Sequence, residues 1–302
     1  MENHKNQPVP ATDRLTLAAV NAMPRPQAEA ALAAIFEHAP WVAAQALAGA
    51  PFATVASLHD AMMQALRTAA AERQLAVIRA HPDLGSKFAR AELTAASRAE
   101  QGALDLDRLS DEEFARFEQL NANYRERFGF PFIICVRRHT RDSILIQFER
   151  RLANSADDER AAALDQIGLI TRLRLCAQVD GPGKPQTDGR LTTHVLDLNA
   201  GCPARRIALS LYEVGASACG LLMQTITNND GRTDTPLLGG GPLRIGTYEI
   251  VFAAAAYFGS QTGTKTWMFY DIALRFSIAE PEGHYHVPLL LTPWSYSTYR
   301  GS

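Results

Sequence analysis

The spacing of apolar residues changes near residue 180, and this change constrains the fold of the chain more than any other feature. From Ala28 to about Cys176, apolar residues recur at spacings of three and four, which is the period of an α-helix. Beyond residue 189 they alternate with the period of two that is typical of a β-strand. The chain therefore holds a helical half and a β half, and its 302 residues suffice for two domains.

The helical half carries signals for where helices begin and end. Phe117, Leu120 and Tyr124 fall on one face of a predicted helix. The segment 110–113 has the form of a capping box, Ser155 precedes an acidic first turn, and a helix should end at Gly129. We expect an all-α helical bundle over residues 1–177.

The stretch 178–189 is polar, is rich in Gly and Pro, and fits neither period, so we expect a linker there. The β domain should then cover residues 190–302. In it Ile207, Leu209 and Leu211 alternate onto one face, and so do Ile250 and Phe252. Turn signals lie at residues 229–231 and 239–242. These patterns predict a β-sandwich of short antiparallel strands.

Composition narrows the possible functions. Thirty Lys and Arg against thirty-two Asp and Glu leave a net charge of −2, which lacks the basic surplus of a general nucleic-acid binder. Four scattered cysteines without a C-x-x-C pair indicate a reducing compartment. We find neither a signal peptide nor a run of about 20 apolar residues, so we expect a cytoplasmic protein without a membrane partner.

The first candidate for chemistry is His81, which directly precedes Pro82. A residue before proline lies near the end of an element, so its imidazole can reach a cleft, although it can equally pack or cap at a helix terminus. Downstream, Ser97, Glu100 and Gln101 share one helical face, which is either a solvated face or a polar binding edge. The aromatic loop 128–133 that follows is either core or the apolar wall of a small-molecule pocket.

Together these segments resemble the family of 2-oxo-4-hydroxy-4-carboxy-5-ureidoimidazoline (OHCU) decarboxylases, which act in the last step of urate degradation. The resemblance covers the whole helical half. Its motifs are F-E-H-A-P-W-V at 36–42, H-P-D-L at 81–84, S-x-x-E-Q at 97–101, F-G-F-P-F-I at 128–133 and I-T-R-L-R-L at 170–175. The resemblance implies an all-α decarboxylase that uses no cofactor.

The same resemblance implies roles for single residues. His81 would be the general acid and base at the reacting carbon. Arg174 would offer its planar guanidinium to a ring carbonyl or a carboxylate, with Arg172 as an alternative for this role. Substrate-binding positions are carried by Ser97, Glu100, Gln101, Phe132, Ile133 and Arg174.

In the β half, two histidines lie on the face that the core does not use. Alternation over residues 283–291 puts Tyr285 and Val287 on one face, and His284 and His286 on the other. Alone, these are solvated surface histidines, or a His-x-His zinc site if a third ligand approaches.

Other segments of the β half resemble the 5-hydroxyisourate (HIU) hydrolases, the transthyretin-like enzymes of the preceding step of urate degradation. They are L-T-T-H-V-L-D at 191–197, N-N-D-G-R at 228–232, G-T-Y-E-I at 246–250 and the ending Y-R-G-S at 299–302. The resemblance implies a transthyretin-like sandwich that assembles into a homotetramer through the C-terminal domain, with sites between subunits and without a metal.

By this second resemblance, His194 and His286 share water activation and proton delivery. Arg232 holds substrate oxygens, the terminal Ser302 closes the site, and His284 has a supporting role. The chain would then convert HIU through OHCU to (S)-allantoin and CO₂, with these small molecules as its partners.

Three alternatives stay open at this point. The β half could be a transthyretin-type carrier or a zinc hydrolase, and the helical half could be an inactive scaffold beside an active hydrolase. The Tyr-Arg-Gly-Ser ending and the histidine pair favour the enzyme over the carrier.

Overall fold

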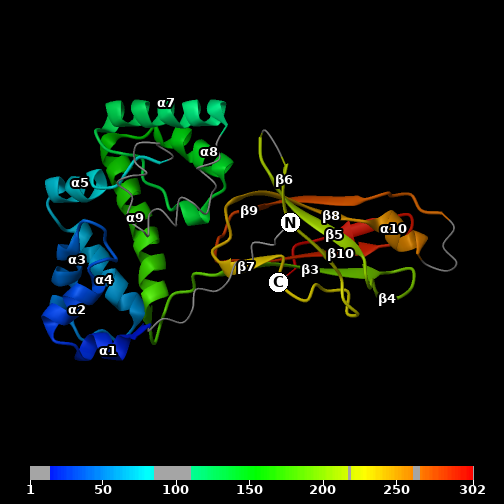
Figure 1. Ribbon diagram of the computed structural model, residues 1–302, viewed down its shortest axis with the longest axis horizontal. Coiled ribbons are helices and arrows are strands. Elements are labelled where there is room, and N and C mark those ends of the chain that lie inside the picture. Colours follow the sequence, from blue (N-terminus) through cyan, green and yellow to red (C-terminus); the bar gives the residue numbers. More distant parts are fainter. Residues whose placement is uncertain (1–13, 85–109, 217–218, 261–265, 302) are drawn as a thin grey trace. The chain divides into compact units, whose positions relative to one another are not determined.

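Figure 1 shows the computed structural model, which describes residues 14–84, 110–216, 219–260 and 266–301. The chain divides into two compact units, and each is described by itself. The first comprises Met1–Glu92, Ala115–Cys135 and Leu152–Gln186. The second comprises Leu93–Phe114, Val136–Arg151 and Thr187–Ser302.

Helices build the first unit, which confirms the predicted helical half. They are α1 (Leu17–Ala22), α2 (Arg25–Leu32), α3 (Pro40–Ala46), the short η1 (Leu47–Gly49), α4 (Val55–Arg67), α5 (Ala71–Arg79), α7 (Asp111–Phe128, from residue 115 on) and α9 (Ala156–Gln178). A parallel pair of two-residue strands, β1 (Leu15–Thr16) and β2 (Val179–Asp180), was not expected from the sequence.

The predicted caps of α7 and α9 are present. The Ser110 and Glu113 side chains each accept the other residue's backbone N–H, at 3.2 and 2.9 Å, which is a capping box. The Ser155 hydroxyl accepts the Asp158 N–H at 3.2 Å, at the start of α9. Gly129, with φ of 72°, follows the last residue of α7.

The core of the first unit includes the facing sides of α4 and α9. Leu58, Met62 and Leu66 of α4 are fully buried, and so is Leu175 of α9. A Cβ built on Gly168 would lie 3.1 Å from the Met63 Cε atom, so the two helices approach closely at this glycine. Because α9 leads from here to Arg174, this packing sets where that side chain lies.

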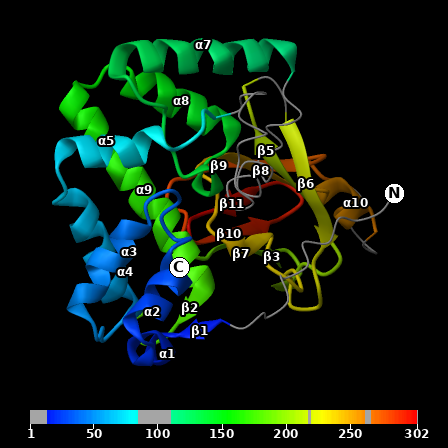
Figure 2. The same ribbon diagram turned by 60° about the vertical axis from the view of Figure 1, so that its left-hand side comes forward.

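Two sheets make the second unit (Figure 1, Figure 2), which confirms the predicted sandwich. One has the strand order β11–β10–β3–β4, with β7 also paired to β3, and the other has the order β6–β5–β8–β9. The strands are β3 (Gly189–Asp197), β4 (Cys202–Pro203), β5 (Ala208–Val214), β6 (Cys219–Ile226), β7 (Leu238–Gly241), β8 (Gly246–Phe252), β9 (Ile272–Ile278), β10 (His284–Leu291) and β11 (Tyr296–Thr298). Helix α10 (Ala254–Gly259), η3 (Val136–Arg138) and α8 (Arg141–Arg151) belong to the same unit.

The alternating residues form the core of the second unit. Ile207, Leu209, Leu211, Ile250 and Phe252 are all at most 2% exposed, as their spacing predicts. The same core takes up Tyr285, Val287, Leu289 and Leu291 of β10. The opposite face of β10 therefore presents His284 and His286, as the alternation predicts.

Two details of the predicted sandwich are wrong. Strand β10 pairs with β3 in parallel. Between these two strands the chain forms strands of both sheets, so β10 is not joined to β3 by a hairpin. Residues 239–241, expected to be part of a turn, belong to strand β7. Their lack of side chains lets β7 lie along β3, where Gly241 pairs with Gly189.

Part of the stretch expected to be a linker packs on the first unit. Val179 and Asp180 form β2, and the Pro182 carbonyl accepts the Val55 N–H at 2.9 Å at the start of α4. A Cβ on Gly183, which has φ of 59°, would lie 2.6 Å from the Thr54 Cβ atom. The domain boundaries at 1–177, 178–189 and 190–302 stay a prediction.

Within the described ranges, no helix combines the length and hydropathy that a membrane span requires. The four cysteines lie within the described ranges and are in the thiol form; Cys135 and Cys176 are buried, and Cys202 and Cys219 are exposed.

Candidate active sites

His81 lies directly after the end of α5. Its Nδ1 atom is 2.9 Å from the Val77 carbonyl oxygen, and a carbonyl can only accept, so Nδ1 carries a proton. Neutral His81 therefore presents the lone pair of Nε2. Burial is the main cause that lowers the pKa of His81, while the Val77 hydrogen bond and Glu37 oppose this change. The result is a neutral imidazole that can accept a proton.

A buried ion pair accompanies His81. The Arg174 guanidinium of α9 lies 3.1 Å from the Glu37 carboxylate, and the two side chains are 10% and 9% exposed. The Glu37 charge raises the pKa of His81 and the Arg174 charge lowers it, both less than burial does. Arg174 is thus one of the charged groups that act on His81, and its contact with substrate stays a prediction. Glu37 was missed as a site residue, although it stands in the F-E-H-A-P-W-V motif.

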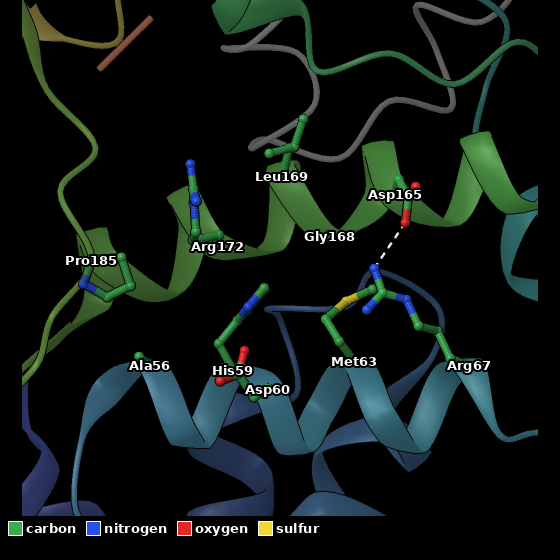
Figure 3. A pocket seen from close by; sticks show the side chains of 10 residues that line it. All are labelled: Ala56, His59, Asp60, Met63, Arg67, Asp165, Gly168, Leu169, Arg172 and Pro185. Atoms are coloured by element: carbon green, nitrogen blue, oxygen red, sulfur yellow. Dashed lines mark hydrogen bonds and ion pairs between the residues drawn. The ribbon is translucent and has the colours of Figure 1, made fainter. Parts of the chain in front are cut away.

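Arg172 lies elsewhere. Together with His59, Asp60, Met63 and Arg67 it lines a groove of about 510 Å³ between α4 and α9 (Figure 3). The Arg67 guanidinium reaches across this groove to the Asp165 carboxylate at 2.8 Å. Burial lowers the pKa of His59 to about 4, so this imidazole is neutral at pH 7. Of the two arginines, the geometry favours Arg174 for the site at His81.

The aromatic loop after α7 is core. The Phe132 and Tyr124 ring centroids lie 5.3 Å apart, edge to face, and Phe132 and Ile133 are 2% and 3% exposed. On α7, the Asn121 amide donates to the Leu84 carbonyl at 2.9 Å, which fixes the chain just after His81. Phe132 and Ile133 are thus buried in the core, and their contact with substrate stays a prediction. Ser97, Glu100 and Gln101 lie outside the described residues.

The second candidate site lies on the outward face of the β3–β10 pair. The backbone of His194 in β3 forms an isolated antiparallel β-bridge with Arg232, and that of His286 in β10 forms one with Gly301. Two glycines permit these close approaches. A Cβ on Gly231 would lie 2.3 Å from the Val195 carbonyl oxygen, and one on Gly301 would lie 2.5 Å from the His286 Cδ2 atom. The structure therefore brings together His194, Arg232 and His286, whose catalytic roles stay predictions. Ser302 lies outside the described residues.

The pKa values of the β-half histidines are all lowered. For His194 and His286 the largest cause is burial and the next is the Arg232 guanidinium, while His284 and His194 lower the pKa of His286 further. For His284 burial acts first and Arg190 second. The site thus holds neutral imidazoles beside a permanent cation.

Two polar residues that the sequence reasoning missed connect these histidines. The Thr192 hydroxyl oxygen lies 3.0 Å from His284 Nε2 and 2.9 Å from His286 Nδ1, and an Arg190 guanidinium nitrogen lies 3.3 Å from His284 Nδ1. The signal for them was available, because alternation along β3 puts residues 190, 192 and 194 on one face. In the part of the chain that is described, no three His, Cys, Asp or Glu side chains form a metal-binding group.

Comparison with known proteins separates the two halves in the same way. The model of the OHCU decarboxylase family matches residues 21–176, and that of the HIUase/transthyretin family matches residues 191–301. Over 161 residues the chain is 44% identical to a 2-oxo-4-hydroxy-4-carboxy-5-ureidoimidazoline decarboxylase of Haloferax volcanii. The matched region covers 53% of this chain and 94% of the relative.

The β half has its own relatives. Over 123 residues the chain is 49% identical to a 5-hydroxyisourate hydrolase of Pseudomonas aeruginosa. The matched region covers 40% of this chain and 97% of the relative. A crystal structure of (S)-allantoin synthase is similar to nearly the whole chain. It aligns with a TM-score of 0.50 and 33% identity, over 95% of this chain and 100% of that one.

Proposed function

The chain belongs to the OHCU decarboxylase family over its helical half and to the HIUase/transthyretin family over its β half, and we propose that it catalyses two consecutive steps of urate degradation. The β half hydrolyses HIU to OHCU, and the helical half decarboxylates OHCU to (S)-allantoin and CO₂. The observation that carries this proposal is the presence of two separate imidazole sites. His81 lies beside the Glu37–Arg174 pair within the first family match, and the His194, Arg232 and His286 group lies within the second.

Hydrolysis of the cyclic acyl linkage in HIU needs an activated water, donors for the developing oxyanion and a proton for the leaving nitrogen. His194 and His286 supply neutral imidazoles, since their pKa values are lowered. Arg232 supplies a cation that stays charged at every relevant pH. Ser302 closes the site, and His284 supports His286.

Decarboxylation of OHCU leaves an electron pair on carbon, which must be delocalised and then protonated on one face to give a single enantiomer. His81 can take up a proton at Nε2 and return it, because its Nδ1 proton is held by the Val77 carbonyl. Arg174, oriented by Glu37, holds a carboxylate or ring carbonyl. Ser97, Glu100 and Gln101 bind the polar edges of the substrate, while Phe132 and Ile133 form its apolar wall. Neither step calls for a cofactor in this proposal.

The β half forms a homotetramer in this proposal, and the chain divides into its two enzymes at residues 178–189. Two features support self-association. The histidines of the site lie on the outward face of a sheet, where a partner subunit can enclose them. Leu221, Leu222 and Ile226 are exposed on the edge strand β6, which offers an apolar surface to a second copy. The cytoplasmic location stays a prediction.

Variants in the two halves test the assignment of the two activities. HIU is generated in situ from urate by a urate oxidase, and circular dichroism follows both steps. His286→Ala should slow the loss of HIU by about 100-fold or more, since it removes a group at the reacting carbonyl. His81→Ala should leave hydrolysis intact and let OHCU accumulate, so that racemic allantoin forms slowly. Hydrolysis at the wild-type rate in His286→Ala would show that the assignment is wrong.

A further inference from the structure

We propose that Arg190, His284 and Thr192 form a directional hydrogen-bond chain that fixes the proton of His286 on Nε2. His286 is then a neutral donor that polarises the scissile carbonyl, and His194 alone moves protons. This division of roles deepens the proposed hydrolase function and rests on it. Arg190, His284 and Thr192 act through His286, so they are positioning residues.

The register of the sheet puts the four side chains in one row. Parallel pairing of β3 with β10 sets Arg190 beside His284 and Thr192 beside His286. All four project from the face opposite the core, because residues two apart on a strand share a face. The contacts follow this row, from Arg190 to His284 at 3.3 Å, to Thr192 at 3.0 Å and to His286 at 2.9 Å.

Counting donors gives the chain its direction. A guanidinium can only donate, so the His284 Nδ1 atom that faces Arg190 accepts. A neutral imidazole with a bare Nδ1 carries its proton on Nε2, and this proton points to the Thr192 hydroxyl oxygen. The hydroxyl then donates its only proton to His286 Nδ1 at 2.9 Å, in preference to the Tyr285 carbonyl oxygen at 3.5 Å. His286 is left with its proton on Nε2.

Charge in the site keeps both rings neutral, as this chain of donors requires. Besides burial, Arg190 lowers the pKa of His284, and Arg232, His284 and His194 lower the pKa of His286. A neutral His286 cannot give up its Nε2 proton without becoming an imidazolate. It can, however, donate a hydrogen bond to a carbonyl oxygen, beside the Arg232 cation, and stabilise the negative charge that develops there.

His194 has the complementary arrangement. Burial and then Arg232 lower the pKa of His194, and a hydrogen bond from its ring to the backbone of Asp230 opposes part of this change. Its Nε2 atom is buried and, among the described residues, has no hydrogen-bond partner. Buried polar atoms in proteins are almost always paired with protein or water, so a bound water or a substrate group is expected at this atom.

The resulting reaction balances with His194 as the only proton carrier. His194 Nε2 takes a proton from water while the water oxygen forms a bond to the carbonyl carbon, and the Arg232 guanidinium and the His286 N–H hold the oxyanion. The oxyanion collapses, the carbon–nitrogen bond breaks with its electron pair on nitrogen, and His194 returns its proton there. The new carboxylic acid releases its proton to solvent.

The test measures the tautomer and the rate separately, on the full-length chain. Nitrogen-15 NMR of protein labelled at histidine reports which ring nitrogen carries the proton, with signals assigned from single histidine variants. Wild type should show His286 protonated on Nε2 and bare on Nδ1. Thr192→Val should lose this preference and lower kcat for HIU by about 10- to 100-fold, which is less than the roughly 100- to 1000-fold loss when an oxyanion donor is removed, because the His286 ring remains. Thr192→Ser, which keeps the hydroxyl, should restore both.

Thr193→Val is the matched control. Thr193 is the next residue on β3, is buried, and donates from its hydroxyl to the Val287 carbonyl at 2.7 Å on the other face of the sheet. Its loss removes one hydrogen bond from the same strand and should leave the His286 tautomer and kcat at wild-type values. A wild-type His286 protonated on Nδ1, or a Thr192→Val variant with unchanged tautomer and kcat, would overturn the proposal. Wild-type protein that fails to hydrolyse HIU would instead remove the proposed hydrolase function, whatever the tautomer.

Discussion

Burial is the largest cause that lowers the pKa of the imidazoles in both sites, and the neighbouring charges differ between them. Burial dominates for His81, and the nearby Glu37 opposes its effect on the pKa. In the β half, the Arg232 cation adds to burial and lowers the pKa of both His194 and His286. A cation beside an imidazole base makes the base weaker but keeps it in its neutral form to lower pH.

The pH dependence of hydrolysis should show the effect of the Arg232 cation on the pKa of His194. His194 takes up a proton only when neutral, so kcat/KM should fall as the pH drops through its pKa, which is lowered from the ordinary value of about 6.5. The charged groups acting on His194 are Arg232 and Asp230, with opposite effects. Arg232→Gln should reduce the rate and also shift the acid limb of the kcat/KM profile to higher pH. An acid limb that stays in place in Arg232→Gln would contradict the assignment of His194 as the base.

Two arginines of α9 provide a matched pair for the decarboxylase site. Arg174→Gln should lower decarboxylase kcat/KM by about 100-fold. It removes the cation proposed to bind the substrate, and it takes away the ion-pair partner of the buried Glu37 carboxylate. Arg172→Gln should stay near the wild-type value, since Arg172 lines the groove between α4 and α9. Both are measured with OHCU supplied by a separate hydrolase. Equal losses in the two variants would show that the site at His81 is not the decarboxylase site.

For single residues, the sequence predicts which side chains take part in a site better than it predicts which residues they contact. Arg172 and Arg174 stand two residues apart on one helix, and the residue that distinguishes them, Glu37, comes from a segment more than a hundred residues away. Only the packed structure shows that contact. Thr192 and Arg190 were accessible from strand alternation, but a threonine and an arginine on a strand carry no signal of their own.

At the scale of the elements, the turn before Arg232 illustrates how backbone geometry builds a site. Asn228 Oδ1 accepts the backbone N–H groups of Asp230 and Arg232 at 3.0 and 3.1 Å, and the chain turns back at Gly231, with φ of 71°. The Gly231 carbonyl accepts the Val195 N–H at 2.8 Å, which holds the turn against β3 next to His194.

Gly231→Ala should therefore disturb both stability and hydrolysis. The φ of 71° alone costs about 1–2 kcal/mol for a residue with a side chain, and the new Cβ would lie 2.3 Å from the Val195 carbonyl oxygen. The turn must move, and Arg232 moves with it. Gly201→Ala is the control, since Gly201 has φ of 65° but nothing within 4 Å of its added Cβ. Thermal unfolding and HIU hydrolysis should show a loss of kcat only in Gly231→Ala. If Gly201→Ala lowered kcat as much, the turn would not be what positions Arg232.

Local pattern predicts the elements well and their pairing less well. Apolar spacings of three and four predicted α7 and α9, and the signals at Ser110, Gly129 and Ser155 predicted where these helices begin or end. The direction of β10 could not be read in this way, because strand alternation is the same for parallel and antiparallel pairs. Helix α10 was also not predicted, since six residues rich in Ala within a strand-forming region carry little periodicity.

At the scale of the whole molecule, the chain carries the second reaction before the first. The helical half, matched to the decarboxylase family, precedes the β half, matched to the hydrolase family. The change of hydrophobic period made this two-part organisation predictable from sequence. The packing of residues 179–186 on the first unit was not predictable, because a Gly- and Pro-rich stretch has no period that would show it.

The assembly is expected to follow the β half. If the outward histidines of β3 and β10 are enclosed by partner subunits, light scattering should give a mass near four times 33.0 kDa. Leu221→Glu on the exposed edge strand β6 places a charge on the apolar surface proposed for self-association. It should lower the mass together with the hydrolase rate, and it should spare decarboxylation. A fully active monomer would contradict the proposed assembly.

The central claim is that one chain performs both steps, and a single reaction course tests it. Wild-type protein is given HIU made in situ from urate, and circular dichroism with chiral chromatography follows the products. The account predicts that OHCU appears only transiently and that the allantoin formed is the S enantiomer. Accumulation of OHCU at the rate of the hydrolase step, followed by slow decay to racemic allantoin, would contradict it and would leave the helical half without the activity assigned to His81.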